Sequence, residues 1–373
     1  MTAAERVPRR PRLASRLPDF PWDTLAGAKA RAAAHPDGIV DLSVGTPVDP
    51  VDEPIRRALY DGSAFPGYPA TIGTVELRQA AAAALQRRYR CVALPDDAVL
   101  PVIGTKEAIA QLPTGLGLGA DDVVVIPEVA YPTYEVGALL AGARPVRADG
   151  TAQLGPERAA LVFVNSPSNP TGKVLGVDHL RKVVSWARER GAIVASDECY
   201  LGLSWEAEPV SILDPRVSDG DLTGLIAIHS LSKTSNLASY RAGFLAGDPE
   251  LIGDLAAVRK HAGAIVPFPV QAAMTYALSV DEHEARQRAR YAARREVLLA
   301  AVRGAGLRVD HSEAGLYLWS TRDEACRDTV NWFADRGILV APGEFYGPQG
   351  ERHVRIALTA TDERIAAAAE RLA

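Results

Sequence analysis

The sequence is poor in cysteine and has no strong excess of charge of either sign. Its 373 residues include three cysteines, Cys91, Cys199 and Cys326, which are far apart and odd in number. This pattern argues against a disulfide framework and a C-x-x-C metal site, and it fits a reducing cytoplasm. The net charge of −5 provides no basic field for nucleic acid or an anionic membrane. We therefore expect a cytoplasmic protein with no metal and no nucleic-acid partner.

The sequence also lacks long hydrophobic runs. No apolar run reaches the roughly 18 residues that a membrane-spanning helix needs, and the arginine-rich segment from Met1 to Asp19 has no apolar core of the secretory type. No membrane association is expected. Neither an internal repeat nor a DNA-binding module is evident. With 47% apolar and 23% charged residues, the chain is suited to two packed domains or one large α/β unit.

Short apolar segments alternate with helical patterns from about residue 99 onward. Each segment is four to six residues long and apolar throughout, which is typical of strands buried on both faces of a mostly parallel sheet. The expected strands are Val99–Ile103, Asp122–Ile126, Ala160–Val164, Ala192–Ser196 and Leu225–His229. The clearest helix between them is 178–190, with Asp178 as its N-cap and Gly191 as its stop.

Past about residue 275 the alternation of apolar strands and helices gives way to a long charged helix and short strands. We expect an α/β fold with an N-terminal arm and part of a small domain at 1–45, a large domain at 46–275, and a smaller α+β domain at 276–373. The arm should include a short helix near 24–34. The small domain should contain a long charged helix, four short strands and a final helix, at 281–303, 307–309, 315–319, 338–340, 353–358 and 362–372.

The motif Ser230-Leu231-Ser232-Lys233 follows the strand 225–229, and Arg241 lies eight residues after the lysine. The lysine amine can form a Schiff base with an aldehyde cofactor. The hydroxyls and the guanidinium can hold the phosphate of that cofactor. A solvated loop lysine would give the same pattern if this motif stood alone.

Further polar and aromatic residues follow the other strands. Gly104-Thr105-Lys106 opens a helix, whose free N–H groups can bind an anion. Tyr131 could stack on a flat ring. Taken singly, the first is also an ordinary strand-to-helix turn and the second a packed aromatic residue.

Two more strand ends carry an amide and a carboxylate. Asn169 stands in the rigid turn Asn169-Pro170-Thr171-Gly172. Asp197 ends a buried strand, where a carboxylate is costly unless it meets a cation such as a protonated pyridine nitrogen. Tyr200 could reach the phenolic oxygen of the same ring. A helix N-cap is the alternative for Asp197.

In this order the motifs resemble those of the pyridoxal-phosphate aminotransferases of fold type I, classes I and II. The resemblance runs from about residue 40 to the end of the chain. It implies a transaminase (EC 2.6.1 type) with pyridoxal 5′-phosphate as cofactor and amino acids and keto acids as substrates. It also implies the fold-type I architecture and a homodimer with shared active sites.

The resemblance implies a role for each residue described above. Lys233 would bind the cofactor and move the substrate proton, while Asp197 would keep the pyridine nitrogen protonated. Asn169 and Tyr200 would hydrogen-bond the 3′-oxygen of the ring, and Tyr131 would stack on the ring. The phosphate would be surrounded by Gly104, Thr105, Lys106, Ser230, Ser232 and Arg241.

Other positions match the family through the resemblance alone. Tyr68 matches the tyrosine that is lent to the phosphate of the neighbouring subunit. Arg355 matches the arginine that clamps the substrate α-carboxylate, next to Asn169 and the backbone of Gly45. Lys106 is a departure, because many family members carry a non-basic residue there.

The substrate is indicated by four more particular segments. Together they resemble the succinyldiaminopimelate transaminases of lysine and diaminopimelate biosynthesis, which would use 2-oxoglutarate as amino acceptor; they are 16–23, 35–50, 259–263 and 341–347. N-Succinyldiaminopimelate has three carboxylates, so cations besides Arg355 are expected in the site. Arg16, Lys260 and His261 are candidates, although each could equally be a surface charge.

Three alternatives remain open. One is another class I/II aminotransferase with an aspartate, alanine or aromatic donor, and a second is a carbon–sulfur lyase with the same cofactor residues. The third is an aminotransferase-like effector domain of a transcription regulator. It is disfavoured because only about 40 residues precede the core and the net charge is negative.

Overall fold

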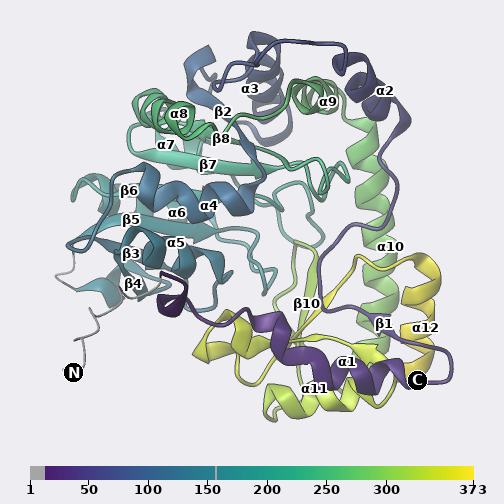
Figure 1. Ribbon diagram of the computed structural model, residues 1–373. Coiled ribbons are helices and arrows are strands. Elements are labelled where there is room, and N and C mark those ends of the chain that lie inside the picture. The colour runs from purple at the N-terminus through teal and green to yellow at the C-terminus, as the bar shows by residue number, and fades with distance from the viewer. Residues whose placement is uncertain (1–12, 156–157) are drawn as a thin grey trace, which may run out of the picture.

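The computed structural model describes residues 13–155 and 158–373 and contains a central sheet flanked by helices (Figure 1). Seven strands lie in the order β2-β8-β7-β6-β5-β3-β4. Their bounds are β2 (Val99–Ile103), β3 (Val123–Ile126), β4 (Arg144–Arg147), β5 (Ala159–Asn165), β6 (Ile193–Asp197), β7 (Leu225–Ser230) and β8 (Ala242–Gly247). Neighbours from β7 to β4 pair in parallel, whereas β8 is antiparallel to both β2 and β7. The predicted α/β fold with a mostly parallel sheet is confirmed.

All five predicted strands of this sheet are present, but two strands were missed. β4 lies at the sheet edge, pairs only with β3 and reads Arg-Pro-Val-Arg, so it lacks the apolar run of a buried strand. β8 reads Ala-Gly-Phe-Leu-Ala-Gly. Its Gly243 packs so closely that a Cβ there would lie 3.0 Å from the carbonyl oxygen of His229. Glycine and alanine allow this close approach of the backbones but have low strand propensity, so the sequence does not indicate a strand here.

Helices cover both faces of this sheet because its strands are apolar on both faces. One hydrophobic core lies against α4 (Thr105–Gly115), α5 (Thr133–Ala141) and α8 (Pro249–Ala262), and the other lies against α3 (Val75–Tyr89), α6 (Val177–Arg188) and α9 (Phe268–Ser279). The predicted N-cap of α6 is wrong. Gly176 occupies that position, and Asp178 lies in the first turn, where its charge favours the positive end of the helix.

A second, smaller region lies below the central sheet in Figure 1. It holds an antiparallel sheet in the order β12-β13-β10-β9 and a parallel pair of β1 and β11. The strands are β1 (Val40–Asp41), β9 (Arg308–Asp310), β10 (Tyr317–Thr321), β11 (Ile338–Leu339), β12 (Ala341–Pro342) and β13 (Val354–Ala357). The predicted strands of the small domain therefore exist, with ends shifted by one to two residues.

The remaining helices connect and cover these sheets. They are α1 (Ala26–Ala33), α2 (Glu53–Gly62), α7 (Pro215–Ser218), α10 (Glu282–Gly304), α11 (Cys326–Ala334) and α12 (Asp362–Leu372). The long helix α10 runs from the central sheet to the small sheet (Figure 1). The arm helix expected near 24–34 is a 3₁₀ turn at Pro21–Leu25 followed by α1. The boundaries at 45 and 275 stay a prediction. None of the described helices is long and apolar enough to cross a membrane.

The loop after β5 packs against the chain that enters β10. Ser312 N–H donates to the Thr171 carbonyl at 2.9 Å, and Ala314 N–H donates to the Gly172 carbonyl at 3.1 Å. Gly172 has φ +69°, and a Cβ there would lie 2.5 Å from the carbonyl oxygen of Ala314. The approach of the two regions therefore requires glycine at this position.

We expect Gly172→Ala to lower the free energy of unfolding by about 2 kcal/mol or more, because the added methyl meets fixed backbone at a positive φ. Urea unfolding measures the effect. Gly253→Ala is the matched control, since nothing lies within 4 Å of a Cβ there and the residue is in the middle of α8; it should stabilise the protein by about 0.5 kcal/mol. Equal effects of the two variants would contradict this packing.

Candidate active site

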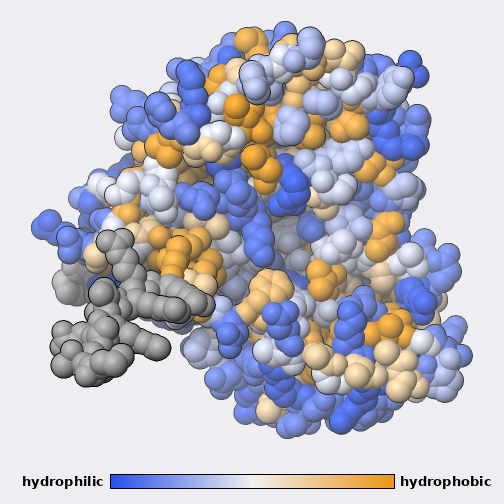
Figure 2. Space-filling model, in the orientation of Figure 1, coloured by the Kyte–Doolittle hydropathy of each residue, from blue (hydrophilic) through white to orange (hydrophobic). Residues whose placement is uncertain are grey.

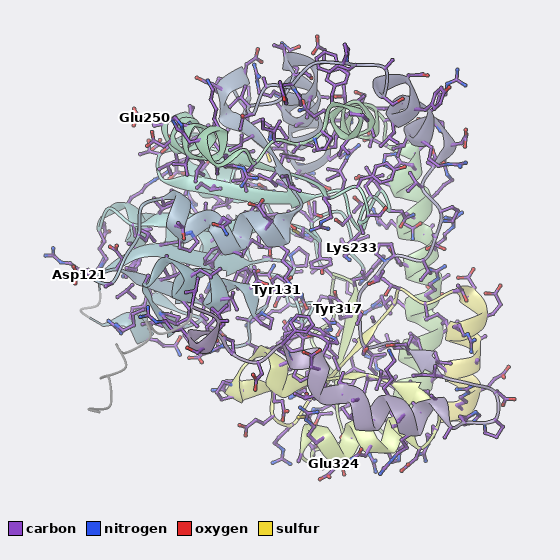
Figure 3. All side chains as sticks on the ribbon, in the orientation of Figure 1. Asp121, Tyr131, Lys233, Glu250, Tyr317 and Glu324 are labelled. Carbon is purple, nitrogen blue, oxygen red and sulfur yellow. The ribbon has the colours of Figure 1, made fainter. Side chains whose placement is uncertain are left out.

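A cavity of about 880 Å³ lies between the carboxyl ends of the central strands and the small sheet. Figure 2 shows a recess on this face, and Figure 3 places Tyr131, Lys233 and Tyr317 around the same region. Most of the residues predicted for the site line this cavity: Gly45, Thr105, Lys106, Tyr131, Asn169, Asp197, Tyr200, Ser230, Ser232, Lys233, Arg241 and Arg355. The ends of five central strands thus meet as expected.

Asp197 is the last residue of β6 and is only 5% exposed. Its Oδ2 accepts a hydrogen bond from the Tyr134 hydroxyl at 2.6 Å, and its Oδ1 accepts one from the Cys199 N–H at 3.1 Å. Burial raises the pKa of Asp197, and these two hydrogen bonds oppose that rise. Among the described residues, no Lys, Arg or His forms an ion pair with this carboxylate. It is therefore available to a cationic group in the cavity.

Tyr134 was missed by sequence reasoning. It follows Tyr131 by three residues, but only Tyr131 was given a role. Tyr134 lies in the first turn of α5, is fully buried and stacks on Phe163 of β5, with ring centroids 4.8 Å apart. Tyr131 precedes the helix, and its ring meets that of Tyr134 edge to face at 5.8 Å; the closeness of the two tyrosines in the sequence was the available signal.

Lys233 follows β7, and its Nζ donates to the Gly45 carbonyl. Burial lowers the pKa of Lys233 to about 8, and the positive charge of Arg355 adds to the shift. A larger residue cannot replace Gly45, since a Cβ there would lie 2.2 Å from the Tyr317 hydroxyl. The amine is therefore held at a fixed place and has a substantial neutral fraction near neutral pH.

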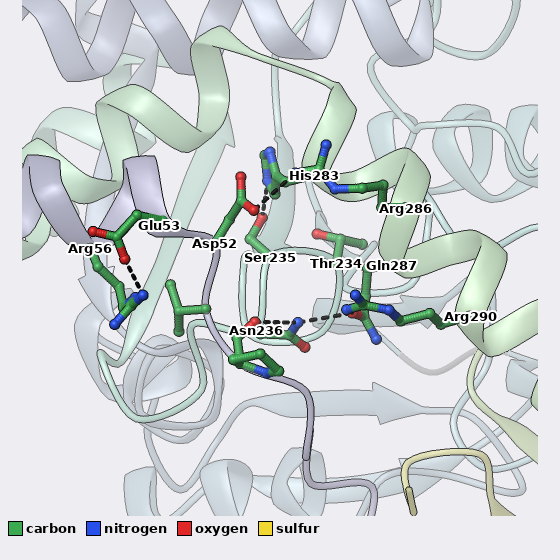
Figure 4. Close-up of a pocket in the computed structure, with 12 residues that line it drawn as sticks. Asp52, Glu53, Arg56, Thr234, Ser235, Asn236, His283, Arg286, Gln287 and Arg290 are labelled. Carbon is green, nitrogen blue, oxygen red and sulfur yellow. Dashed lines mark hydrogen bonds and ion pairs between the residues drawn. The ribbon is translucent and has the colours of Figure 1, made fainter. Parts of the chain in front are cut away.

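The loop that carries Lys233 is anchored on α10 beside a second cavity of about 230 Å³ (Figure 4). Ser235 Oγ bonds His283 Nε2 at 2.8 Å, and Asn236 Nδ2 donates to Gln287 Oε1 at 2.9 Å. These bonds fix the backbone directly after Lys233.

The group around Arg241 suits a phosphate. Arg241 lies between β7 and β8, and its guanidinium rests on Gly104, where a Cβ would come within 2.2 Å of it. Gly104 is the N-cap of α4, so the free N–H groups of that helix start point to the same place. The hydroxyls of Ser230 and Ser232 also line the cavity. Helix N–H groups, hydroxyls and a guanidinium are the donors that a phosphate monoester needs.

Arg355 lies on β13 and is 3% exposed. It donates to Asn169 Oδ1 at 2.9 Å and to the Ser43 carbonyl at 2.8 Å, and its guanidinium carbon lies 4.0 Å from the ring centre of Tyr317. No described carboxylate pairs with it. A buried guanidinium without a counter-charge is suited to bind a carboxylate.

Several predicted residues lie elsewhere or face other partners. Tyr68 is 98% exposed and does not line the cavity. The ammonium of Lys106 lies 5.3 Å from the ring centre of Phe20, so it faces the N-terminal segment. Neither Arg16 nor the two α8 residues Lys260 and His261 line the cavity.

The sequence analysis also gave no role to several cavity residues, although Trp22 and Ser43 lie inside the segments 16–23 and 35–50. Lys29, Trp22 and Ser43 line the cavity, as does Tyr317, whose hydroxyl lies 3.0 Å from the Tyr200 hydroxyl. They come from the arm and the small sheet, and no strand-end pattern marks them. No group of His, Cys, Asp and Glu that could hold a metal occurs in the described ranges.

The family model for aminotransferase class I and II matches residues 37–372. The chain belongs to this family. It is 67% identical over 366 residues to the probable aminotransferase Rv1178 of Mycobacterium tuberculosis, covering 98% of this chain and 88% of that protein. It is 58% identical over 356 residues to the 4-dedimethylamino-4-oxo-anhydrotetracycline transaminase OxyQ of Streptomyces rimosus, covering 95% and 99%.

A solved structure agrees with this assignment. The probable N-succinyldiaminopimelate aminotransferase of Thermus thermophilus has a TM-score of 0.84 and 29% identity, covering 95% of this chain and 99% of that one. The aminotransferase therefore has the fold-type I architecture, and its cofactor is pyridoxal phosphate. The buried Asp197 carboxylate and the donors around Arg241 fit the pyridine nitrogen and the phosphate of that cofactor.

We expect the rate at which the apo-aminotransferase captures pyridoxal phosphate to rise with pH and to reach half its maximum near pH 8. The reason is that only the neutral amine is a nucleophile, and the pKa of Lys233 is lowered to about 8. Stopped-flow absorbance between pH 6 and 10 measures the rate. A midpoint above pH 10 would contradict the lowered pKa, and Lys233→Ala, the control, should give no visible cofactor band.

Proposed function

We propose that this aminotransferase moves the amino group of N-succinyl-L,L-2,6-diaminopimelate to 2-oxoglutarate. The observation that carries the transamination chemistry is the meeting of Lys233, Asp197 and Arg355 in one cavity. The choice of donor is supported by the likeness to the Thermus thermophilus structure named above and by the cations of the cavity.

Each part of the cofactor has residues that would hold it. Asp197 would face the pyridine nitrogen, Tyr131 would stack on the ring, and Asn169 and Tyr200 would donate to its 3′-oxygen. Lys233 would carry the cofactor aldehyde. The phosphate would be bound by Gly104, Thr105, Lys106, Ser230, Ser232 and Arg241. When bound, pyridoxal phosphate supplies an electron-withdrawing ring that stabilises negative charge on the substrate Cα.

The protein side chains position the substrate and move its proton. Arg355 binds the α-carboxylate in the plane of its guanidinium, with Asn169 beside it. Lys233, as a neutral amine, would take the proton from the substrate Cα. It would then give that proton to the carbon that came from the cofactor aldehyde. The hydrogen bonds from Tyr134 and Cys199 favour the ionised form of Asp197 against the effect of burial, which provides negative charge at the opposite end of the site. Two half-reactions of this kind give ping-pong kinetics.

The distal end of the substrate would meet cations other than those expected from the sequence. Lys29 and Lys106 line the cavity, whereas Lys260, His261 and Arg16 do not. Because Lys106 is assigned to the phosphate, Lys29 is the additional cation for a distal carboxylate, besides Arg355 at the α-carboxylate. This second cation favours a donor with more than one carboxylate.

A second candidate is amino transfer to a large ring ketone. It is favoured by the 58% identity to OxyQ and by the apolar side chains on one wall of the cavity, which come from Leu17, Phe20, Trp22, Leu25 and Ile109. A flat polycyclic substrate would pack on such a wall.

A half-reaction screen separates these candidates. We expect the visible cofactor band to convert on adding N-succinyldiaminopimelate, with glutamate converting it as well and alanine more slowly. Lys29→Met should raise KM for N-succinyldiaminopimelate by about threefold, because one exposed ion pair is lost, and should leave alanine unaffected. Equal changes for both donors, or conversion only with glutamate and a ring ketone as acceptor, would reject the proposed donor.

The active unit is proposed to be a homodimer in which Tyr68 reaches the phosphate group of the partner subunit. Tyr68 is fully exposed, and Tyr60 and Phe65 nearby are also exposed apolar residues. Large apolar side chains exposed to this degree are often covered in an oligomer.

We expect sedimentation at the mass of a dimer, and Tyr68→Phe should weaken cofactor binding by about fivefold without separating the subunits, because one hydrogen bond to a charged group is lost. Equilibrium dialysis and sedimentation velocity measure the two effects, with Tyr60→Phe as control. A fully active monomer would contradict the shared site.

A further inference from the structure

A buried imidazole and a buried carboxylate lie in contact on the reverse face of the central sheet, behind the cavity. Glu198 directly follows Asp197, and His229 directly precedes Ser230. Neighbouring residues of an extended chain point to opposite faces, so the two side chains point away from the cavity. His229 Nε2 lies 3.1 Å from Glu198 Oε2, and the two side chains are 7% and 0% exposed.

The pair is closely confined. The imidazole stacks on Phe244 of β8 at 5.2 Å between ring centres and on Tyr89 at the end of α3 at 5.9 Å. Glu198 Oε1 accepts the Ile212 N–H at 2.7 Å. The space left around the pair is about 20 Å³, room for a single water. The two facing atoms, His229 Nε2 and Glu198 Oε2, have no hydrogen-bond partner among the described residues, and the space beside them holds at most one water.

Other ionisable groups also face this space. Tyr89 approaches from α3 and Cys199 from the turn after β6, and burial raises the pKa of both well above their ordinary values. Arg88 and Glu284 also line the space and pair with each other at 2.9 Å, and Arg88 pairs with Asp281 as well. Tyr89 and Cys199 are therefore neutral at ordinary pH, and Glu198 is the carboxylate in contact with the imidazole.

We propose that Glu198 and His229 form a positioning pair that joins the ends of β6 and β7 and thereby fixes Asp197 relative to the loop of Lys233. β6 and β7 are parallel neighbours, with Asp197 opposite Ile228, and the Glu198 N–H donates to the Ile228 carbonyl at 2.9 Å. Past that bond the ladder ends, and the side-chain pair is the next link between the strands. This inference rests on the proposed function of Asp197 and Lys233.

The pair also acts on Asp197 through charge. Burial raises the pKa of Asp197, and the positive charge of His229 is among the influences that lower it. A protonated His229 thus favours an ionised Asp197, the form that a protonated pyridine nitrogen needs.

A double-mutant cycle tests the proposal on the holoenzyme. We expect Glu198→Gln and His229→Gln each to raise the dissociation constant of pyridoxal phosphate about tenfold and to shift the pH midpoint of the visible absorbance band, because each leaves one buried polar group without its partner. The double variant, in which neither original group is left alone, should lie closer to wild type than either single variant. Glu198→Asp keeps a carboxylate at this place and should lie closer to the wild-type midpoint than Glu198→Gln, even if a single glutamine variant does not fold.

His353→Gln is the matched control. It breaks a second His–carboxylate pair, in which His353 lies 2.8 Å from Asp310 and stacks on Trp319 at 4.9 Å. It should lower Tm and leave the cofactor midpoint unchanged. The inference is overturned if wild type binds the cofactor while both single variants keep its dissociation constant and midpoint within about twofold. If wild type itself binds no pyridoxal phosphate, the proposed function fails instead.

Discussion

The negative charge on Asp197, buried without a cation, is the constraint on which the site depends. A carboxylate costs several kcal/mol to bury unless its charge is compensated. Two hydrogen bonds, from the Tyr134 hydroxyl and the Cys199 N–H, compensate only in part. The remaining compensation is left to a bound cationic ring, so affinity for the cofactor is built into the end of β6.

The other groups of the site are placed by the topology of the sheet. Parallel strands end at one edge, which brings Gly104, Asn169, Asp197 and Lys233 together although they are far apart in the sequence. The antiparallel strand β8 adds the exception: the chain turns back after β7, and Arg241 at that turn returns to the start of α4. This single reversal of chain direction brings Arg241 to the other residues that would bind the phosphate.

Sequence reasoning found what depends on local pattern. The buried strands were recognised because they are apolar on both faces. The strand-end residues were recognised because a polar group at the end of a buried strand is costly unless it has a partner. β4 and β8 were missed because an edge strand tolerates arginine and proline, and a closely packed strand requires glycine. Lys29 could not be found, since only tertiary packing brings the arm helix to the cavity. The expectation for Lys260 and His261 came from resemblance, which does not specify where a helix points its side chains.

The two walls of the cavity have different origins. The cofactor wall is made by strand ends that also hold the central core, so substitutions there disturb folding and chemistry together. The opposite wall is made by the segment Leu17–Leu25 and by residues of the small domain such as Tyr317 and Arg355. Leu25 lies in the hydrophobic core, whereas 18–20 are exposed, so an ancestral enzyme could acquire new donors or acceptors by substitutions at these exposed positions while its reaction stayed intact.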